Sequence, residues 1–159
     1  MSLRNGFATL LGVIAALLIL SVSQAKAGEP PNTFGAGLIL GEPTGFSAEY
    51  TLTPMAAIDA AFAYSYLRQS DWQVHADYLF TGFHLFQGEP TGLEEYLGIG
   101  GRWKFESSQR IGVRIPFGVS YQLPSLTQLQ FFGEGAPIVD FEPDLSMSFN
   151  IDVGVRYFF

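Results

Sequence analysis

The chain has 159 residues, no cysteine, and a formal net charge of −7 from 8 basic and 15 acidic residues. The lack of cysteine excludes disulfides, thiolate zinc sites and a cysteine nucleophile, and an acidic chain without a basic cluster argues against nucleic acid as a partner. Aromatic residues make up 15% of the chain and glycine occurs 18 times, which suits the wall of a membrane β-barrel. The two histidines show no ligand spacing, so neither a metal nor another cofactor is predicted.

The first 27 residues are predicted to be a cleaved secretory signal peptide. Arg4 supplies the positive charge, an apolar segment follows over residues 7–22, and Ala25-Lys26-Ala27 forms a cleavage box of small residues. A transmembrane helix is the alternative, but the apolar segment is shorter than the roughly 20 residues that a span requires. Residues 28–159 are therefore expected to form one domain.

Alternation of apolar and polar residues then predicts eight strands. They are expected at about 34–40, 46–52, 56–66, 72–80, 95–105, 111–121, 127–136 and 148–159. One face of most strands is apolar and rich in aromatic residues, whereas the other carries the charges and many glycines. A soluble lipocalin-type barrel would enclose its apolar faces. These faces are too continuous and too aromatic to be placed in water, so we expect them to face lipid.

Three places depart from regular alternation. Pro116 lies inside the sixth strand, where its missing N–H predicts a bulge or a local kink. Phe132 and two glycines interrupt the pattern of the seventh strand. The acidic segment from Pro137 to Ser146 is predicted to be a loop before the last strand.

Several segments resemble a family of small bacterial outer-membrane proteins, the OmpA/OmpX-like barrels. They are residues 57–65, 74–80, 97–102 and 112–118, and the similarity covers nearly all of 34–159. The resemblance implies an eight-stranded antiparallel up-and-down transmembrane β-barrel in the outer membrane of a Gram-negative-type bacterium. Its expected surroundings are outer-membrane lipid and the barrel assembly machinery, as a monomer, and no external partner is indicated. Bacterial outer-membrane barrels end on an aromatic strand, which makes Phe159 a candidate assembly signal.

Charged residues on the predicted inward faces are expected to form a neutralising network that plugs the lumen. We predict that Arg102, Arg114 and Arg156 each lie within salt-bridge distance of one of the five inward carboxylates. The full predicted set is Glu49, Asp59, His75, Asp77, Arg102, Lys104, Arg114, Glu134, Asp152 and Arg156.

A structural or surface-interaction role without catalysis follows from this interpretation. A lipid-modifying enzyme and a narrow pore are the alternatives. His75 and Asp77 share a face and could orient a general base, but the His-x-Ser motif of lipid A deacylases is absent from the sequence.

Aromatic residues are predicted to form two belts at the membrane interfaces. The belt at the outer interface would comprise Tyr64, Tyr66, Trp72, Trp103, Phe105 and Phe149. The periplasmic belt would comprise Tyr50, Tyr78, Phe80, Tyr121, Tyr157 and Phe159.

Overall fold

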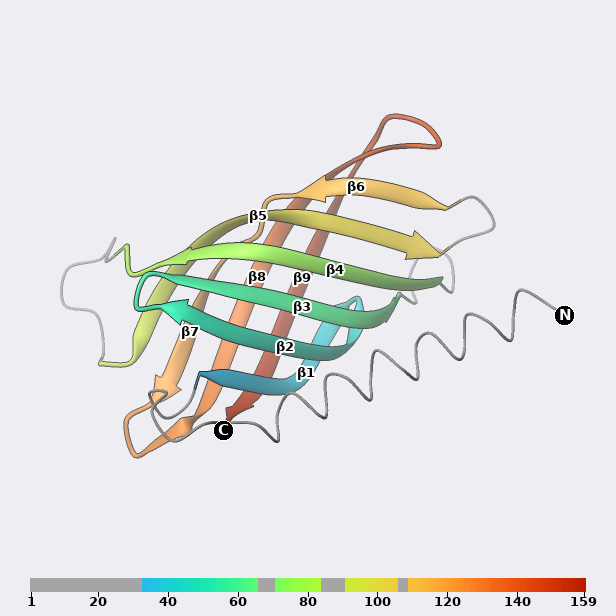
Figure 1. The fold of residues 1–159 in the computed structure, drawn as a ribbon. Helices are drawn as coiled ribbons and strands as arrows, with labels where there is room; N and C mark the ends of the chain where they lie inside the picture. Colours follow the sequence, from blue (N-terminus) through green and yellow to red (C-terminus); the bar gives the residue numbers. More distant parts are fainter. Residues whose placement is uncertain (1–32, 66–70, 84–90, 106–108) are drawn as a thin grey trace, which may run out of the picture. The chain divides into compact units, whose positions relative to one another are not determined.

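The computed structural model describes residues 33–65, 71–83, 91–105 and 109–159, all of which belong to one compact unit. The predicted signal peptide and Tyr66 lie outside these residues. Within the described ranges the regular secondary structure consists of β-strands (Figure 1). None of the described segments is a helix long and apolar enough to cross a membrane.

The strands form a closed antiparallel ring. Consecutive strands pair with each other except β6 and β7, each of which pairs with both β5 and β8, and β1 pairs with β9 to close the ring (Figure 1). The strands are β1 (Phe34–Glu42), β2 (Thr44–Thr53), β3 (Ala56–Ser65), β4 (Asp71–Thr81), β5 (Leu93–Phe105), β6 (Arg110–Arg114), β7 (Phe117–Leu123), β8 (Leu126–Glu142) and β9 (Ser146–Phe158).

The predicted sixth strand is divided into β6 and β7 at Ile115 and Pro116. The nine segments therefore form a barrel wall of eight full-length strands, which we call staves, and β6 and β7 belong to the same stave. The strand is interrupted at Ile115 and Pro116, but the predicted bulge is absent because no residue is inserted. Arg114 pairs with Gly100 and Phe117 with Leu97, which is the same register on both sides of the break. The proline carbonyl still accepts a hydrogen bond from the Gly98 N–H at 2.7 Å.

Strand β8 is longer than predicted, and the prediction of an acidic loop over 137–146 holds only for residues 143–145, which separate β8 from β9. The strand continues through Pro137, whose carbonyl accepts a hydrogen bond from the Ile115 N–H at 3.0 Å. Proline removes only a donor, and here its acceptor is used by the neighbouring strand. Asp140 consequently becomes a strand residue and is buried.

The polarity of the barrel is reversed relative to a soluble protein. Large apolar side chains such as Phe46 and Trp72 are 68% and 49% exposed, whereas Arg114 is 0% exposed and Asp77 and Arg156 are also buried. A solvent-exposed apolar wall of this extent would be unfavourable in water, and lipid removes that cost. The predicted assignment of inward and outward faces is thereby confirmed.

The described members of both aromatic belts lie on the outer wall or at intermediate exposure. Neighbouring rings contact one another within each belt: Trp72 lies 5.0 Å from Tyr64, and Tyr157 lies 5.2 Å from Phe159, measured between ring centroids. Tyr64, Trp72 and Phe105 are in register on three adjacent strands. None of these rings points into the lumen, which is consistent with an interfacial role.

Candidate functional site in the barrel lumen

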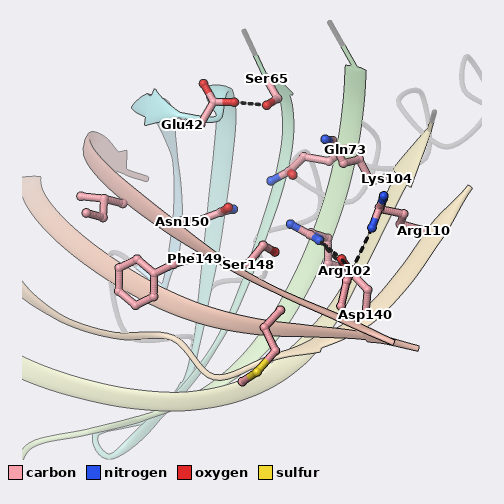
Figure 2. Close-up of a pocket in the computed structure, with 13 residues that line it drawn as sticks. Glu42, Ser65, Gln73, Arg102, Lys104, Arg110, Asp140, Ser148, Phe149 and Asn150 are labelled. Carbon is pink, nitrogen blue, oxygen red and sulfur yellow. Dashed lines mark hydrogen bonds and ion pairs between the residues drawn. The ribbon is translucent and has the colours of Figure 1, made fainter. Parts of the chain in front are cut away.

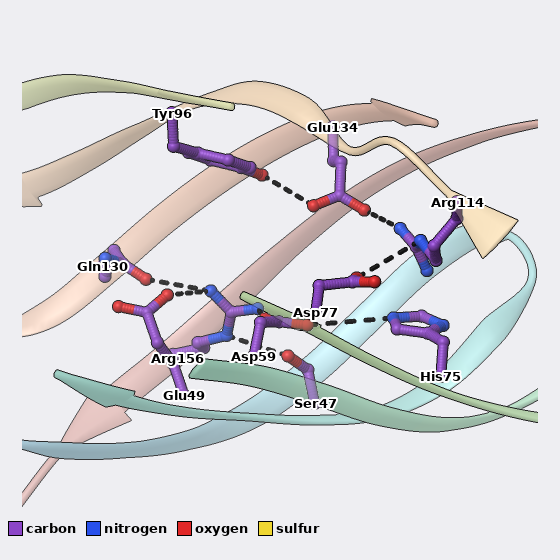
Figure 3. A network of polar contacts seen from close by, with 10 residues as sticks. All are labelled: Ser47, Glu49, Asp59, His75, Asp77, Tyr96, Arg114, Gln130, Glu134 and Arg156. Carbon is purple, nitrogen blue, oxygen red and sulfur yellow. Dashed lines mark hydrogen bonds and ion pairs between the residues drawn. The ribbon is translucent and has the colours of Figure 1, made fainter. Parts of the chain in front are cut away.

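Arg156 on β9 organises the first cluster in the lumen (Figure 3). Its Nη1 lies 2.6 Å from Glu49 Oε2, its Nη2 contacts Asp59 Oδ2, and its Nε donates to Ser47 Oγ at 2.8 Å. The guanidinium also lies over the Phe132 ring, 3.9 Å from the centroid, a favourable cation–π geometry. Phe132, which interrupts the sequence alternation, is therefore an inward residue that supports the arginine.

Arg114 on β6 organises the second cluster. Its Nε lies 3.2 Å from Asp77 Oδ2, and its Nη2 contacts Glu134 Oε1. Tyr96 donates its hydroxyl hydrogen to the other oxygen of Glu134 at 3.1 Å. These four side chains are buried and come from four different staves (Figure 3). A charge this far from water requires such partners to offset its desolvation.

His75 lies beside both clusters, with its Nε2 3.8 Å from Asp59 Oδ1. Asp59, His75 and Asp77 also offer ligand atoms within 4.8 Å of one another, so they are the described group that could hold a metal ion. Both carboxylates, however, are already ion-paired, Asp59 with Arg156 and Asp77 with Arg114. Two adjacent guanidinium groups disfavour a further cation at this position, and we assign the three residues to the polar network.

Arg102 does not pair with any of the five predicted carboxylates, and this correction follows from the course of β8. Its Nη2 lies 2.6 Å from Asp140 Oδ2 and 2.7 Å from Asp140 Oδ1. Lys104 Nζ lies 3.5 Å from Asp71 Oδ2. Both acidic partners lie in segments that the sequence analysis assigned to loops.

Glycines explain how these contacts join side chains on two staves that are separated by a third stave. Asp77 and Arg114 are each in register with Gly100 on the strand between them. Arg102 and Asp140 are likewise each in register with Gly112. Because the intervening residue has no side chain, the two charged groups meet above it. The same arrangement joins Tyr96 to Glu134 across Gly118 and Arg156 to Ser47 across Gly37.

Asp152 is the predicted network residue whose contacts differ most from expectation. It is buried, and it is in register with Gly41 on one side and Glu134 on the other. Its Oδ1 has no hydrogen-bond partner among the described residues. The remaining predicted residues fall into two groups, one around Arg114 and Arg156 and one around Arg102 and Lys104.

A closed antiparallel ring with an apolar outer wall and a charged lumen defines the chain as a small β-barrel of the outer-membrane type. It is similar in fold to the N-terminal β-barrel domain of Pseudomonas aeruginosa OprF, with a TM-score of 0.63 at 14% identity over 82% of this chain and 100% of that chain. The comparison confirms the predicted OmpA/OmpX-like barrel fold.

Neisserial surface protein A is a second solved structure that resembles the chain. Its TM-score is 0.46 at 16% identity, over 79% of this chain and 94% of that chain. No protein-family model and no curated protein sequence matches the chain. At sequence identities of 14% and 16%, the structural similarity concerns the fold alone.

Proposed function

We propose that the chain is an integral, monomeric barrel of the outer membrane of a Gram-negative-type bacterium, with a structural or surface-interaction role. The reversed polarity carries this proposal. Trp72 and Phe46 stand on an apolar outer wall while Arg114 and Asp77 are buried. Lipid is the surrounding that makes this distribution favourable. The partners implied are outer-membrane lipid and, during biogenesis, the barrel assembly machinery.

The lumen is proposed to be closed by its ion network. An eight-stranded barrel has an interior just wide enough to be filled by side chains. Here the Arg114 and Arg156 clusters draw partners from β2, β3, β4, β5 and β8, and thus from most of the circumference (Figure 3). His75 contacts Asp59 within the same network, so no catalytic role is proposed for it.

Negligible ion conductance is the expected result for the unmodified protein in planar lipid bilayers. The reason is that Arg114 and Arg156 cross the lumen and contact four carboxylates. The measurement is single-channel recording on refolded protein, with its insertion verified independently. A steady, reproducible current would contradict closure and favour the narrow-pore alternative.

Phe159, the residue directly after β9, is proposed as an assembly signal. Its side chain is 63% exposed, and its ring stacks with Phe34 at 6.5 Å between centroids. Deleting Phe159 should reduce outer-membrane insertion in cells much more than refolding in detergent. Phe34→Ala is the matched control, because it removes the same ring contact but leaves the C-terminal residue intact. Equal losses in the two assays, or equal behaviour of the two variants, would make Phe159 a packing residue only.

A further inference from the structure

The barrel holds a cavity at the end opposite to Phe158, where β1, β3, β5 and β8 end. Its volume is about 560 Å³. Polar side chains of several staves line it together with the apolar Met147, Phe149 and Ile151; the polar ones are Glu42, Ser65, Gln73, Arg102, Lys104, Arg110, Asp140, Ser146, Ser148 and Asn150 (Figure 2). We call this cavity the vestibule. It lies beyond the Arg114 and Arg156 clusters, whose residues are not part of its lining.

Three buried nitrogen donors on the vestibule wall have no hydrogen-bond partner among the described residues. They are Gln73 Nε2, Arg102 Nε and Asn150 Nδ2, on β4, β5 and β9. All three side chains are more than nine-tenths buried. Figure 2 shows the ends of these side chains pointing toward the same region. A buried donor left unpaired is unfavourable, so an acceptor that reaches these three atoms is favoured.

The unpaired Nε of Arg102 favours an anion as that acceptor. The positive charges of Arg102, Lys104 and Arg110 are offset by Glu42, by Asp140 and by Asp71, which lies 3.5 Å from Lys104 Nζ, so the formal charges balance before an anion enters. Asp140 occupies Arg102 through Nη2, but the Nε of the same guanidinium remains without a partner. Hydrogen bonds from an arginine to an oxyanion are among the stronger ones in proteins.

We propose that the vestibule is a binding site for an oxyanion, specifically a phosphate group, held by Gln73, Arg102 and Asn150. Several acceptor oxygens on one atom match donors that converge from three staves. The phosphate could belong to a free solute or to a lipid headgroup, since both carry the same chemistry. This site goes beyond the proposed structural role, and it lies at the same end of the barrel as the predicted outer aromatic belt.

The test uses the full barrel refolded in a phosphate-free maltoside detergent and titrated calorimetrically with inorganic phosphate, with chloride holding the ionic strength constant. Saturable binding is expected. The double variant Gln73→Leu/Asn150→Leu should raise the dissociation constant about tenfold or more, because two donors to a charged ligand are lost. Gln122→Leu is the matched control at the opposite end of the barrel, and it should bind like the parent.

A second titration with monomeric dihexanoyl phosphatidic acid separates the two sources of the phosphate. Saturable binding of the inorganic ion indicates a free solute, and binding of the lipid alone indicates a headgroup. Saturable binding of neither probe, or the same dissociation constant for the parent and the double variant, would overturn the site. Heat-modifiable gel mobility verifies that each variant is folded. The test requires neither a membrane nor a closed lumen, so its failure is distinguishable from failure of the proposed function.

Discussion

Arg114→Met is expected to destabilise the folded barrel by about 3–5 kcal/mol, because it leaves two buried carboxylates without their cation. Arg114 is 0% exposed and contacts both Asp77 and Glu134. The measurement is urea-induced unfolding in lipid vesicles, monitored by tryptophan fluorescence. Methionine preserves much of the side-chain volume of arginine, so the decrease in the free energy of unfolding reports mainly on the removed positive charge.

Two further variants separate ion pairing from packing at this position. Combining Arg114→Met with Asp77→Asn and Glu134→Gln should recover most of the lost stability, because no uncompensated charge remains. Lys104→Met, close to the end of the barrel, should cost clearly less than Arg114→Met, because Lys104 keeps 11% exposure and its pair with Asp71 spans 3.5 Å. If the triple variant were as unstable as Arg114→Met, or if Lys104→Met cost as much, the network would not be the source of the stability.

Gly100→Ala is expected to produce the second large effect, although it adds only one methyl group. A Cβ at this position would collide with Asp77 Oδ1 and with the Ala76 carbonyl, at the place where Asp77 and Arg114 meet. Overpacking typically costs about 1–3 kcal/mol, and displacement of a buried ion pair adds to that cost. Urea-induced unfolding in vesicles again supplies the measurement.

The adjacent Gly101→Ala is the matched control for this prediction. Gly101 faces the opposite side of β5, and the nearest atom to a Cβ there is the Gly112 carbonyl oxygen at 4.0 Å. The substitution should change the free energy of unfolding by less than about 0.5 kcal/mol. Similar losses for both variants would show that β5 tolerates no added methyl on either face, and the explanation through Asp77 would be wrong.

The direction of each side chain could be predicted from the sequence because the strand period of two assigns it without knowledge of the neighbours. Asn150, Asp152 and Arg156 accordingly point inward as expected. The pairing between staves could not be predicted, because it depends on register. Register places Gly112 between Arg102 and Asp140, and Gly100 between Asp77 and Arg114.

The sequence pattern does not reveal Asp140 as a lumen residue, because it lies in the acidic segment after Pro137 that is typical of a loop. Asp140 shares the inward parity of Glu134, and extending the alternation past the proline would have placed both on the lumen face. The role of Phe132 is likewise not evident from the pattern. An aromatic residue on a polar face weakens the pattern, yet in the folded barrel it lies beneath the Arg156 guanidinium, where its ring face attracts the cation.

The reversed polarity of the barrel is tested most directly by the fluorescence of its two native tryptophans. Trp72 and Trp103 are the only tryptophans in the chain, and both stand on the outer wall. Refolding into vesicles of lipids with brominated acyl chains should therefore quench the tryptophan emission strongly relative to unbrominated lipids, and only in the species with heat-modifiable gel mobility. A folded barrel whose emission is unchanged by brominated lipids would contradict the account.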